Sequence, residues 1–173
     1  MASYYYLIAS LPELSADGDM PITYDEFLSL CRSNVSDTKY SLLEKLTLSS
    51  TEGPLIREWA GFYKKLTGEL NYQRSAALGR SYSPPQEKDA NISQVVAAAL
   101  AARNPLEAEK ILLEYEFENL DAIMGLHMFD DYVLFGYAVK LKLLERLKSF
   151  DHEKGKEEFK SLFYVIQKRV YSL

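Results

Sequence analysis

The chain has 173 residues, of which 47% are hydrophobic and 26% charged, and its formal net charge is −5. This length suffices for one domain that buries about two-thirds of its unfolded surface, and the single cysteine excludes an internal disulfide. The negative charge argues against a nucleic-acid partner, because neutralisation of phosphates by Lys and Arg supplies most of that affinity.

The first uncharged stretch, Met1 to Pro12, lacks the basic flank and the small-residue cleavage site of a signal peptide. No later stretch approaches the roughly 20 apolar residues that cross a bilayer. The lone thiol of Cys31 fits a reducing compartment. We therefore expect a cytoplasmic protein without direct membrane insertion.

Three consecutive tyrosines, Tyr4 to Tyr6, open the chain. Tyrosine favours strands, but a single strand here would have no partner, so we expect a helical turn or a short extended arm docked on helices. A large ring with a hydroxyl that can stay wet suits a half-buried seam between elements or between chains.

Two short helices are predicted next. Thr23 and Glu26 have the spacing of a capping box, which predicts a helix over residues 24–32. The Ser36–Asp37 pair can cap a second helix over residues 39–48.

A long amphipathic helix is predicted from Pro54 to Leu78, because proline is tolerated in a first turn and apolar residues then recur at spacings of three and four. These residues are Leu55, Trp59, Phe62, Tyr63, Leu66 and Leu70. Gly61 and Gly68 weaken this helix by about 1 kcal/mol each relative to Ala, and their function would be to admit a neighbouring helix closely.

Residues 80–91 combine a Pro-Pro pair with small and charged residues, as is typical of a linker. The sequence therefore divides into an N-terminal helical half (1–79), the linker (80–91) and a C-terminal helical half (92–173). We expect both halves to share one core.

Four further helices are predicted after the linker. Residues 93–103 are nearly all apolar and small, which indicates a buried helix. Asn104 and Pro105 provide the cap and first turn of a helix that ends at Gly125. This helix has two apolar stripes, which predict a central position; they are Ala108, Ile111, Leu112, Tyr115, Ala122 and Ile123, and Leu106, Leu113, Phe117, Leu120 and Met124.

Asp130 can cap the next helix, over residues 130–150, in which apolar residues at roughly heptad spacing should face inward. These are Leu134, Tyr137, Ala138, Leu141 and Leu144. The last segment, residues 157–173, has one apolar stripe, formed by Phe159, Leu162, Phe163, Ile166 and Val170. Together these patterns predict an all-α fold, an irregular bundle of about seven helices with a short extended N-terminal segment as an option.

Charge is segregated along the second half: residues 105–135 are mostly acidic and residues 136–173 mostly basic. Either the acidic and basic helices lie beside each other within the fold, or a charged face meets a partner. The same choice applies to Lys140, Lys142, Arg146 and Lys148, which fall outside the apolar seam and form either a solvated face or a partner-binding strip.

The sequence contains no Gly-x-Ser-x-Gly motif, phosphate-binding loop, calcium loop or Glu-x-x-His pair, so we predict no cofactor and no metal site. One cluster has catalytic residue types: His127, Asp130 and Asp131 at a helix junction. Aspartate at a helix start also satisfies free amides, which explains these acids without catalysis. The aromatic cluster of Phe129, Tyr132, Phe135 and Tyr137 is expected to be core packing between helices.

Four stretches resemble a bacterial family of unassigned function whose genes sit among those of V-type ATPase subunits. They are YYYLIASLPEL, PITYDEFLSLC, NPLEAEKILLEYEFENLD and FDDYVLFGYAVKLKLLERL, and the resemblance covers essentially the whole chain.

The last two stretches also resemble, faintly, the helical repeat of the funnel-shaped subunit of V/A-type ATPases, in which an acidic helix precedes an Asp-led helix with a basic end. That funnel subunit has three such repeats, links the rotor stalk to the membrane ring and performs no chemistry. This chain has room for about one repeat.

The resemblance implies a non-catalytic subunit or assembly factor that serves ion transport by a bacterial V-type ATPase. It would bind other soluble ATPase subunits and lie at the periphery of the inner membrane through that complex. The contact candidates are Tyr4, Tyr5, Tyr6, Lys140, Lys142, Arg146 and Lys148. The alternatives are a helical adaptor or homodimer unrelated to the ATPase, and an enzyme that uses the His127, Asp130 and Asp131 group.

Overall fold

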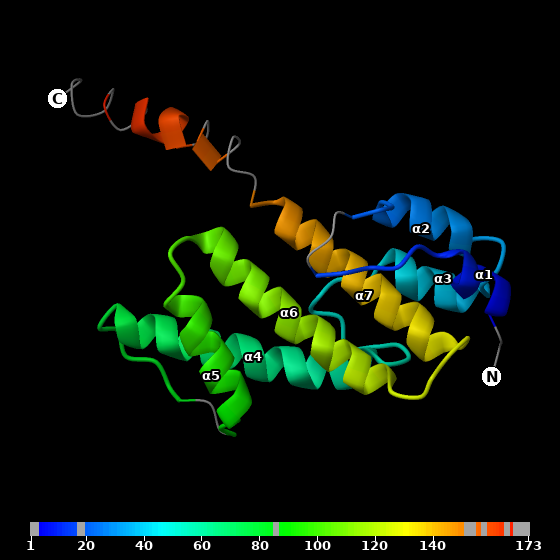
Figure 1. Cartoon of the computed structure of the whole chain (residues 1–173), viewed down its shortest axis with the longest axis horizontal. Coiled ribbons are helices and arrows are strands. Elements are labelled where there is room, and N and C mark those ends of the chain that lie inside the picture. Colours follow the sequence, from blue (N-terminus) through cyan, green and yellow to red (C-terminus); the bar gives the residue numbers. More distant parts are fainter. Residues whose placement is uncertain are drawn as a thin grey trace.

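The computed structural model describes residues 4–16, 20–84, 87–150, 155–156, 159–164 and 167. All regular secondary structure in this part of the chain is helical, which confirms the all-α prediction (Figure 1). The helices are α1 (Tyr5–Ser10), α2 (Tyr24–Cys31), α3 (Asp37–Glu44), α4 (Ile56–Ala77), α5 (Ala90–Leu100), α6 (Pro105–Met124) and α7 (Asp131–Lys148), and residues 159–164 are helical as well.

The N-terminal segment combines both of the expected conformations. Tyr5 and Tyr6 begin α1, and residues 12–15, which follow it, have no regular secondary structure. These residues and Leu11 form an N-terminal arm on α7, where the Tyr137 hydroxyl donates a hydrogen bond of 2.9 Å to the Pro12 carbonyl. The alternative of a strand at the tyrosines is therefore wrong. Tyr5 and Tyr6 lie in α1, and the described part of the chain contains no strand with which they could pair.

Side-chain caps fix the starts of several helices as predicted. The Thr23 hydroxyl accepts from the Glu26 amide (3.2 Å) and the Glu26 carboxylate accepts from the Thr23 amide (2.7 Å), which completes the capping box of α2. Asn104 caps α6 and Asp130 caps α7, each through a side-chain oxygen that accepts first-turn amides. Ser36 precedes α3 without a side-chain cap bond.

The long helix α4 starts two residues later than the sequence predicts. Leu55 has φ of 63°, in the left-handed region, so Pro54 and Leu55 form a turn and the helix begins at Ile56. Leu55 is itself buried, and this burial offsets the cost of a conformation that a branched side chain rarely adopts.

The close contact between helices is at Gly136, not at Gly61 or Gly68 as predicted. An added Cβ at Gly61 or Gly68 would meet no atom within 4 Å, so these glycines admit no neighbour. At Gly136 of α7 an added Cβ would overlap the Met124 sulfur of α6. Gly136 therefore lets α6 and α7 approach closely near the loop that joins them.

The helices pack into a main core and a smaller cluster. The main core contains buried side chains from α1, α2, α3, α4, α6 and α7, so residues on both sides of the 80–91 linker share it. The smaller cluster joins α4, α5 and α6. As predicted, α6 is central: it contacts α4, α5 and α7 (Figure 1). The largest fully buried side chains include Trp59, Phe27, Phe135, Leu43, Ile56 and Leu113.

Helix α5 is buried on one face only, contrary to the expectation of a fully buried helix. Asp89 caps it, so it begins at Ala90, earlier than predicted. Ile92, Val96 and Ala99 are buried, whereas Leu100 is exposed. Helices α4 and α6 cover one side of α5, and the small alanines leave little apolar surface on the other side.

Helix α7 has the predicted inward seam, with Leu134, Ala138, Leu141 and Leu144 buried and Tyr137 partly buried. The predicted apolar stripe after α7 is not buried: Phe159, Leu162 and Phe163 are exposed. Ile166 and Val170 lie outside the described residues. No helix in the described part of the chain has both the length and the apolar composition needed to cross a bilayer.

Cys31 is fully buried at the end of α2, and burial raises the pKa of its thiol to about 12. Because the thiolate is the reactive form, we expect alkylation by iodoacetamide at pH 8 to be very slow in the folded protein. Its rate should rise with urea in parallel with the loss of helical circular dichroism. Rapid labelling of the folded protein would show that Cys31 is accessible.

Candidate functional site

Of the three tyrosines expected at an interface, Tyr4 belongs to the fold itself. It is buried, and its amide donates to the Phe129 carbonyl at 2.7 Å. Lys39 donates to the Tyr4 hydroxyl (3.3 Å) and to Asp131 (2.6 Å). Burial, followed by the hydrogen bond with Asp131, raises the pKa of Tyr4. Tyr4 thus fastens α1 to α3 and to the start of α7.

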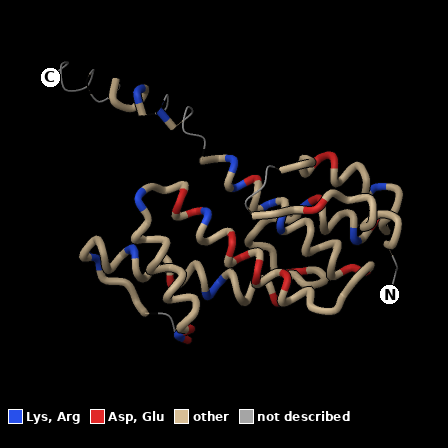
Figure 2. Tube along the Cα trace, in the orientation of Figure 1, with Lys and Arg blue, Asp and Glu red and all other residues tan. Residues whose placement is uncertain are grey.

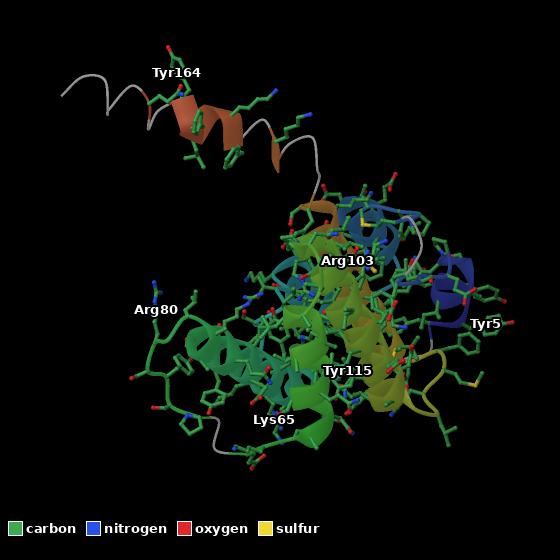
Figure 3. All side chains as sticks on the ribbon, turned by 60° about the vertical axis from the view of Figure 1, so that its left-hand side comes forward. Tyr5, Lys65, Arg80, Arg103, Tyr115 and Tyr164 are labelled. Carbon is green, nitrogen blue, oxygen red and sulfur yellow. The ribbon has the colours of Figure 1, made fainter. Side chains whose placement is uncertain are left out.

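Tyr5 and Tyr6 are exposed, and Tyr5, which points outward in Figure 3, contacts Phe129 in the loop between α6 and α7. The centroid of the Tyr5 ring lies 4.6 Å from the ring centroid of Phe129 in the loop and 5.4 Å from the ring centroid of Tyr6. Tyr6 is 88% exposed and Leu126 is 99% exposed. We call Tyr5, Tyr6, Leu126 and Met128 the end patch.

The His127 group is explained by local structure. His127 Nδ1 lies 2.5 Å from an Asp130 oxygen, and the His127 ring stacks on Tyr132 with centroids 4.2 Å apart. The other Asp130 oxygen caps α7, while Asp131 bonds Lys39. Burial raises the pKa of Asp130, but His127 and the capped amides outweigh it and the net pKa is lowered. The acids thus have different partners, and the group lines no part of the groove described below.

The basic residues of α7 turn largely inward, so a solvated face is the wrong description of most of them. Lys140 bonds Asp121 at 2.6 Å and lies 4.9 Å from the Phe117 ring centroid. Lys142 bonds Glu145 at 2.9 Å and lies 3.6 Å from the Tyr24 ring centroid. Lys148, in the last turn of α7, is exposed.

Arg146 joins two buried carboxylates of α6. Its Nε bonds Glu109, and its two Nη atoms bond Glu116 at 3.0 and 2.5 Å. The Glu116 side chain is only 1% exposed. Burial raises the pKa of Glu116, whereas the two carboxylates outweigh the desolvation of Arg146 and raise the pKa of its guanidinium. Arg146 therefore joins α6 to α7 within the fold, and its side chain is only 24% exposed.

These pairs decide between the two explanations of the charge segregation. Acidic residues follow α6, and basic residues of α7 lie beside them (Figure 2). The first explanation holds for these pairs: Lys140 and Arg146 of α7 neutralise Asp121, Glu109 and Glu116 of α6 within the fold.

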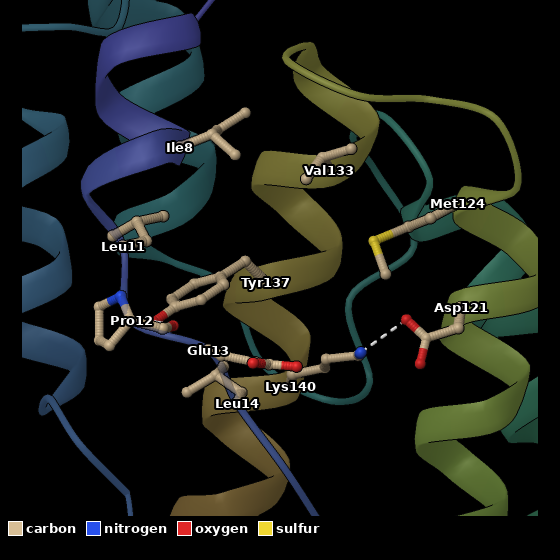
Figure 4. Close-up of a pocket in the computed structure, with 10 residues that line it drawn as sticks. All are labelled: Ile8, Leu11, Pro12, Glu13, Leu14, Asp121, Met124, Val133, Tyr137 and Lys140. Carbon is tan, nitrogen blue, oxygen red and sulfur yellow. Dashed lines mark hydrogen bonds and ion pairs between the residues drawn. The ribbon is translucent and has the colours of Figure 1, made fainter.

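A groove between the N-terminal arm, α6 and α7 comprises two adjoining pockets, which share Glu13, Leu14, Asp121 and Lys140. Figure 4 shows the upper one. The upper part of the groove, about 330 Å³, is lined by apolar side chains that include Ile8, Leu11 and Met124, and by the charged side chains of Glu13, Asp121 and Lys140. Its lower part is bounded by the exposed carboxylates Glu13, Glu114, Glu118 and Asp121. The upper part of the groove is therefore mixed in character, and the lower part is mostly acidic.

Sequence reasoning missed this groove. Its signal is divided between the arm and two helices more than 100 residues away, and nothing in the sequence pairs them. The described residues contain no group of three or more His, Cys, Asp or Glu side chains arranged to hold a metal.

Comparison with protein-family models, with curated proteins and with solved structures gives no match to this chain.

Proposed function

We propose that this protein is a non-catalytic helical subunit or assembly factor of a bacterial V-type ATPase, with a stalk or coupling role. The resemblance of its sequence to proteins encoded beside ATPase subunits carries the proposal. The helical fold is compatible with it, since the resemblance implies a protein that offers contact surface and no chemistry.

The pair α6 and α7 supports the proposal at the level of structure. An acidic helix leads into an Asp-capped helix with a basic end, which is the order expected of one repeat of the funnel subunit. The two helices lie side by side and exchange ion pairs through Lys140 and Arg146. They thus form one compact unit that positions the loop between them.

We assign the contact with other ATPase subunits to the end patch. Its four side chains are large, apolar and exposed, and lie on α1 and on the α6–α7 loop. Exposed apolar clusters of this kind are typical of protein interaction sites. Of the predicted contact residues, Tyr5, Tyr6 and Lys148 are exposed, and Tyr5 and Tyr6 belong to the patch.

The double variant Tyr6→Ser, Leu126→Ser tests this assignment. Because each truncated anchor in an interface typically costs 1–2 kcal/mol or more, we expect its affinity for the ATPase subunits to fall at least about tenfold. The measurement is capture of purified soluble subunits by the immobilised protein. Helical circular dichroism should stay unchanged, since both side chains are exposed.

Tyr82→Ser is the matched control, because Tyr82 is also exposed but lies in the linker, outside the end patch. This control should bind like the unmodified protein. Failure of the unmodified protein to capture any soluble ATPase subunit would contradict the proposed function. Capture that is equal for all three proteins would contradict only the role of the end patch.

A further inference from the structure

His127 separates the two exposed loop residues of the end patch. Leu126 and Met128 are 99% and 66% exposed, whereas the side chain of His127 is 38% exposed. Two contacts cover its ring: Nδ1 lies 2.5 Å from a carboxylate oxygen of Asp130, and the imidazole stacks on the Tyr132 ring at an interplanar angle of 8°. The tip of the loop is thus fastened to α7 through the residue between its two apolar side chains.

Other bonds hold the two ends of this loop. The His127 amide donates to the Met124 carbonyl at the end of α6 (2.9 Å). On the other side, the Phe129 carbonyl accepts from the Tyr4 amide (2.7 Å), and the Phe129 ring packs on that of Tyr5. Because these bonds act at the ends of the loop, the residues between them depend on the imidazole for their position.

The contact between His127 and Asp130 changes in strength with the charge of the imidazole. Histidine ordinarily changes charge between about pH 5 and 8. A hydrogen bond between ionised groups is about twice as strong as one between neutral groups. Burial raises the pKa of Asp130, but the hydrogen bond and charge of His127, together with the capped amides of α7, lower it overall. Asp130 therefore remains a carboxylate at the acid pH where the imidazole is charged.

The other charged and titratable groups around the imidazole have partners of their own. The Tyr132 hydroxyl donates to Glu58 of α4 (3.2 Å), and this bond raises the pKa of Tyr132 despite the opposing charge of Arg57. The phenol therefore stays neutral. Asp131 of α7 pairs with Lys39 of α3 at 2.5 Å. Of these residue types, histidine is the one that ordinarily titrates near neutral pH.

We infer that His127 is a positioning residue for the end patch, and that protonation of its imidazole strengthens binding through this patch. The charged imidazole holds the loop tip on Asp130, so that Leu126 and Met128 are presented together with the tyrosines of α1. Deprotonation leaves the ring stacking in place and removes the charge-assisted bond, so the loop tip becomes less ordered. This inference rests on the proposed function for its partner and adds a response to pH.

Order in the loop tests the inference on the full chain without any partner. Backbone NMR relaxation of Leu126 and Met128 should give higher order parameters at about pH 5.5 than at about pH 7.5. His127→Gln, which cannot become charged, and Asp130→Asn, which keeps a capping side chain, should each show equal order at the two pH values. His152→Gln removes the other histidine of the chain and should behave like the unmodified protein. Loop order that is independent of pH in the unmodified protein would overturn the inference.

Capture of purified soluble ATPase subunits at the same two pH values measures the consequence for binding. Dividing the affinity of the unmodified protein by that of His127→Gln cancels any titration of the partner. This ratio should fall about two- to fivefold from the lower to the higher pH, a modest change because exposed ion pairs are weak. The same ratio for His152→Gln should fall equally.

The two measurements separate this inference from the proposed function. A ratio that does not change with pH, although subunits are captured, would overturn the role of His127 and leave the proposed function standing. Capture of no subunit at either pH would contradict the proposed function. The order of the loop would then decide by itself whether His127 positions Leu126 and Met128.

Discussion

Replacing Arg146 with methionine is expected to lower the free energy of unfolding by about 3–5 kcal/mol, because it leaves Glu109 and Glu116 buried without their cation. For a chain of this size the melting temperature should fall by about 10 °C. The effect would be large, since domains are typically stable by only 5–15 kcal/mol. Urea denaturation followed by circular dichroism measures it.

Lys148→Met is the matched control, because Lys148 lies two residues further along α7 and is exposed. Its free energy of unfolding should change by less than about 0.5 kcal/mol. Adding Glu109→Gln and Glu116→Gln to Arg146→Met should recover part of the loss, since neutral amides are less costly to bury than carboxylates. An Arg146→Met protein as stable as the control would contradict the buried ion cluster.

The second large effect is expected at Trp59, the single tryptophan of the chain. It is fully buried, its Nε1 donates to the Leu48 carbonyl at 3.2 Å, and its ring packs on Phe62 and Tyr63. Trp59→Ala should lower the free energy of unfolding by about 3–5 kcal/mol, because it removes a large ring from a packed core. Thermal and urea denaturation give the value.

Trp59→Phe separates volume from hydrogen bonding. It keeps an aromatic ring and loses the indole donor, so its cost should be smaller, about 1–2 kcal/mol. In the unmodified protein the tryptophan fluorescence should be blue-shifted and move to longer wavelength on unfolding. Emission typical of a solvated indole in the folded protein would contradict the burial of Trp59.

The features that the sequence predicts best depend on residues close together in the chain. Thr23 with Glu26, Asn104 with Pro105, and Asp130 each mark a helix start, because capping involves residues within one turn. The heptad seam of α7 and the two apolar stripes of α6 likewise follow from one periodic segment. These signals suffice for the fold class and for the order of the helices.

The features that the sequence does not predict depend on distant neighbours. Arg146 has the spacing of a surface residue on α7, and only the position of Glu116 on α6 explains its burial. Gly136 is tightly packed and Gly61 is not, because Met124 faces one and nothing faces the other. The groove is likewise formed by the Glu13 arm and α6, which no sequence pattern brings together.

The three tyrosines predicted as contact residues also differ in burial because of distant neighbours. Tyr4, Tyr5 and Tyr6 are equal in sequence, yet the carbonyl of Phe129 and the ammonium of Lys39 hold Tyr4 inside while its two neighbours stay outside. The presence of a surface tyrosine could be predicted, but not which one, because that depends on where the α6–α7 loop meets α1.

The central claim, membership of a V-type ATPase, is tested most directly by isolating the complex from its native membranes through a tag on one of its known ATP-hydrolysing subunits. We predict that this chain is present in a fixed stoichiometric ratio, in the complete complex or in an assembly intermediate, as measured by quantitative mass spectrometry. Its absence from both, together with a normal amount of assembled ATPase in a strain that lacks the gene, would contradict the claim.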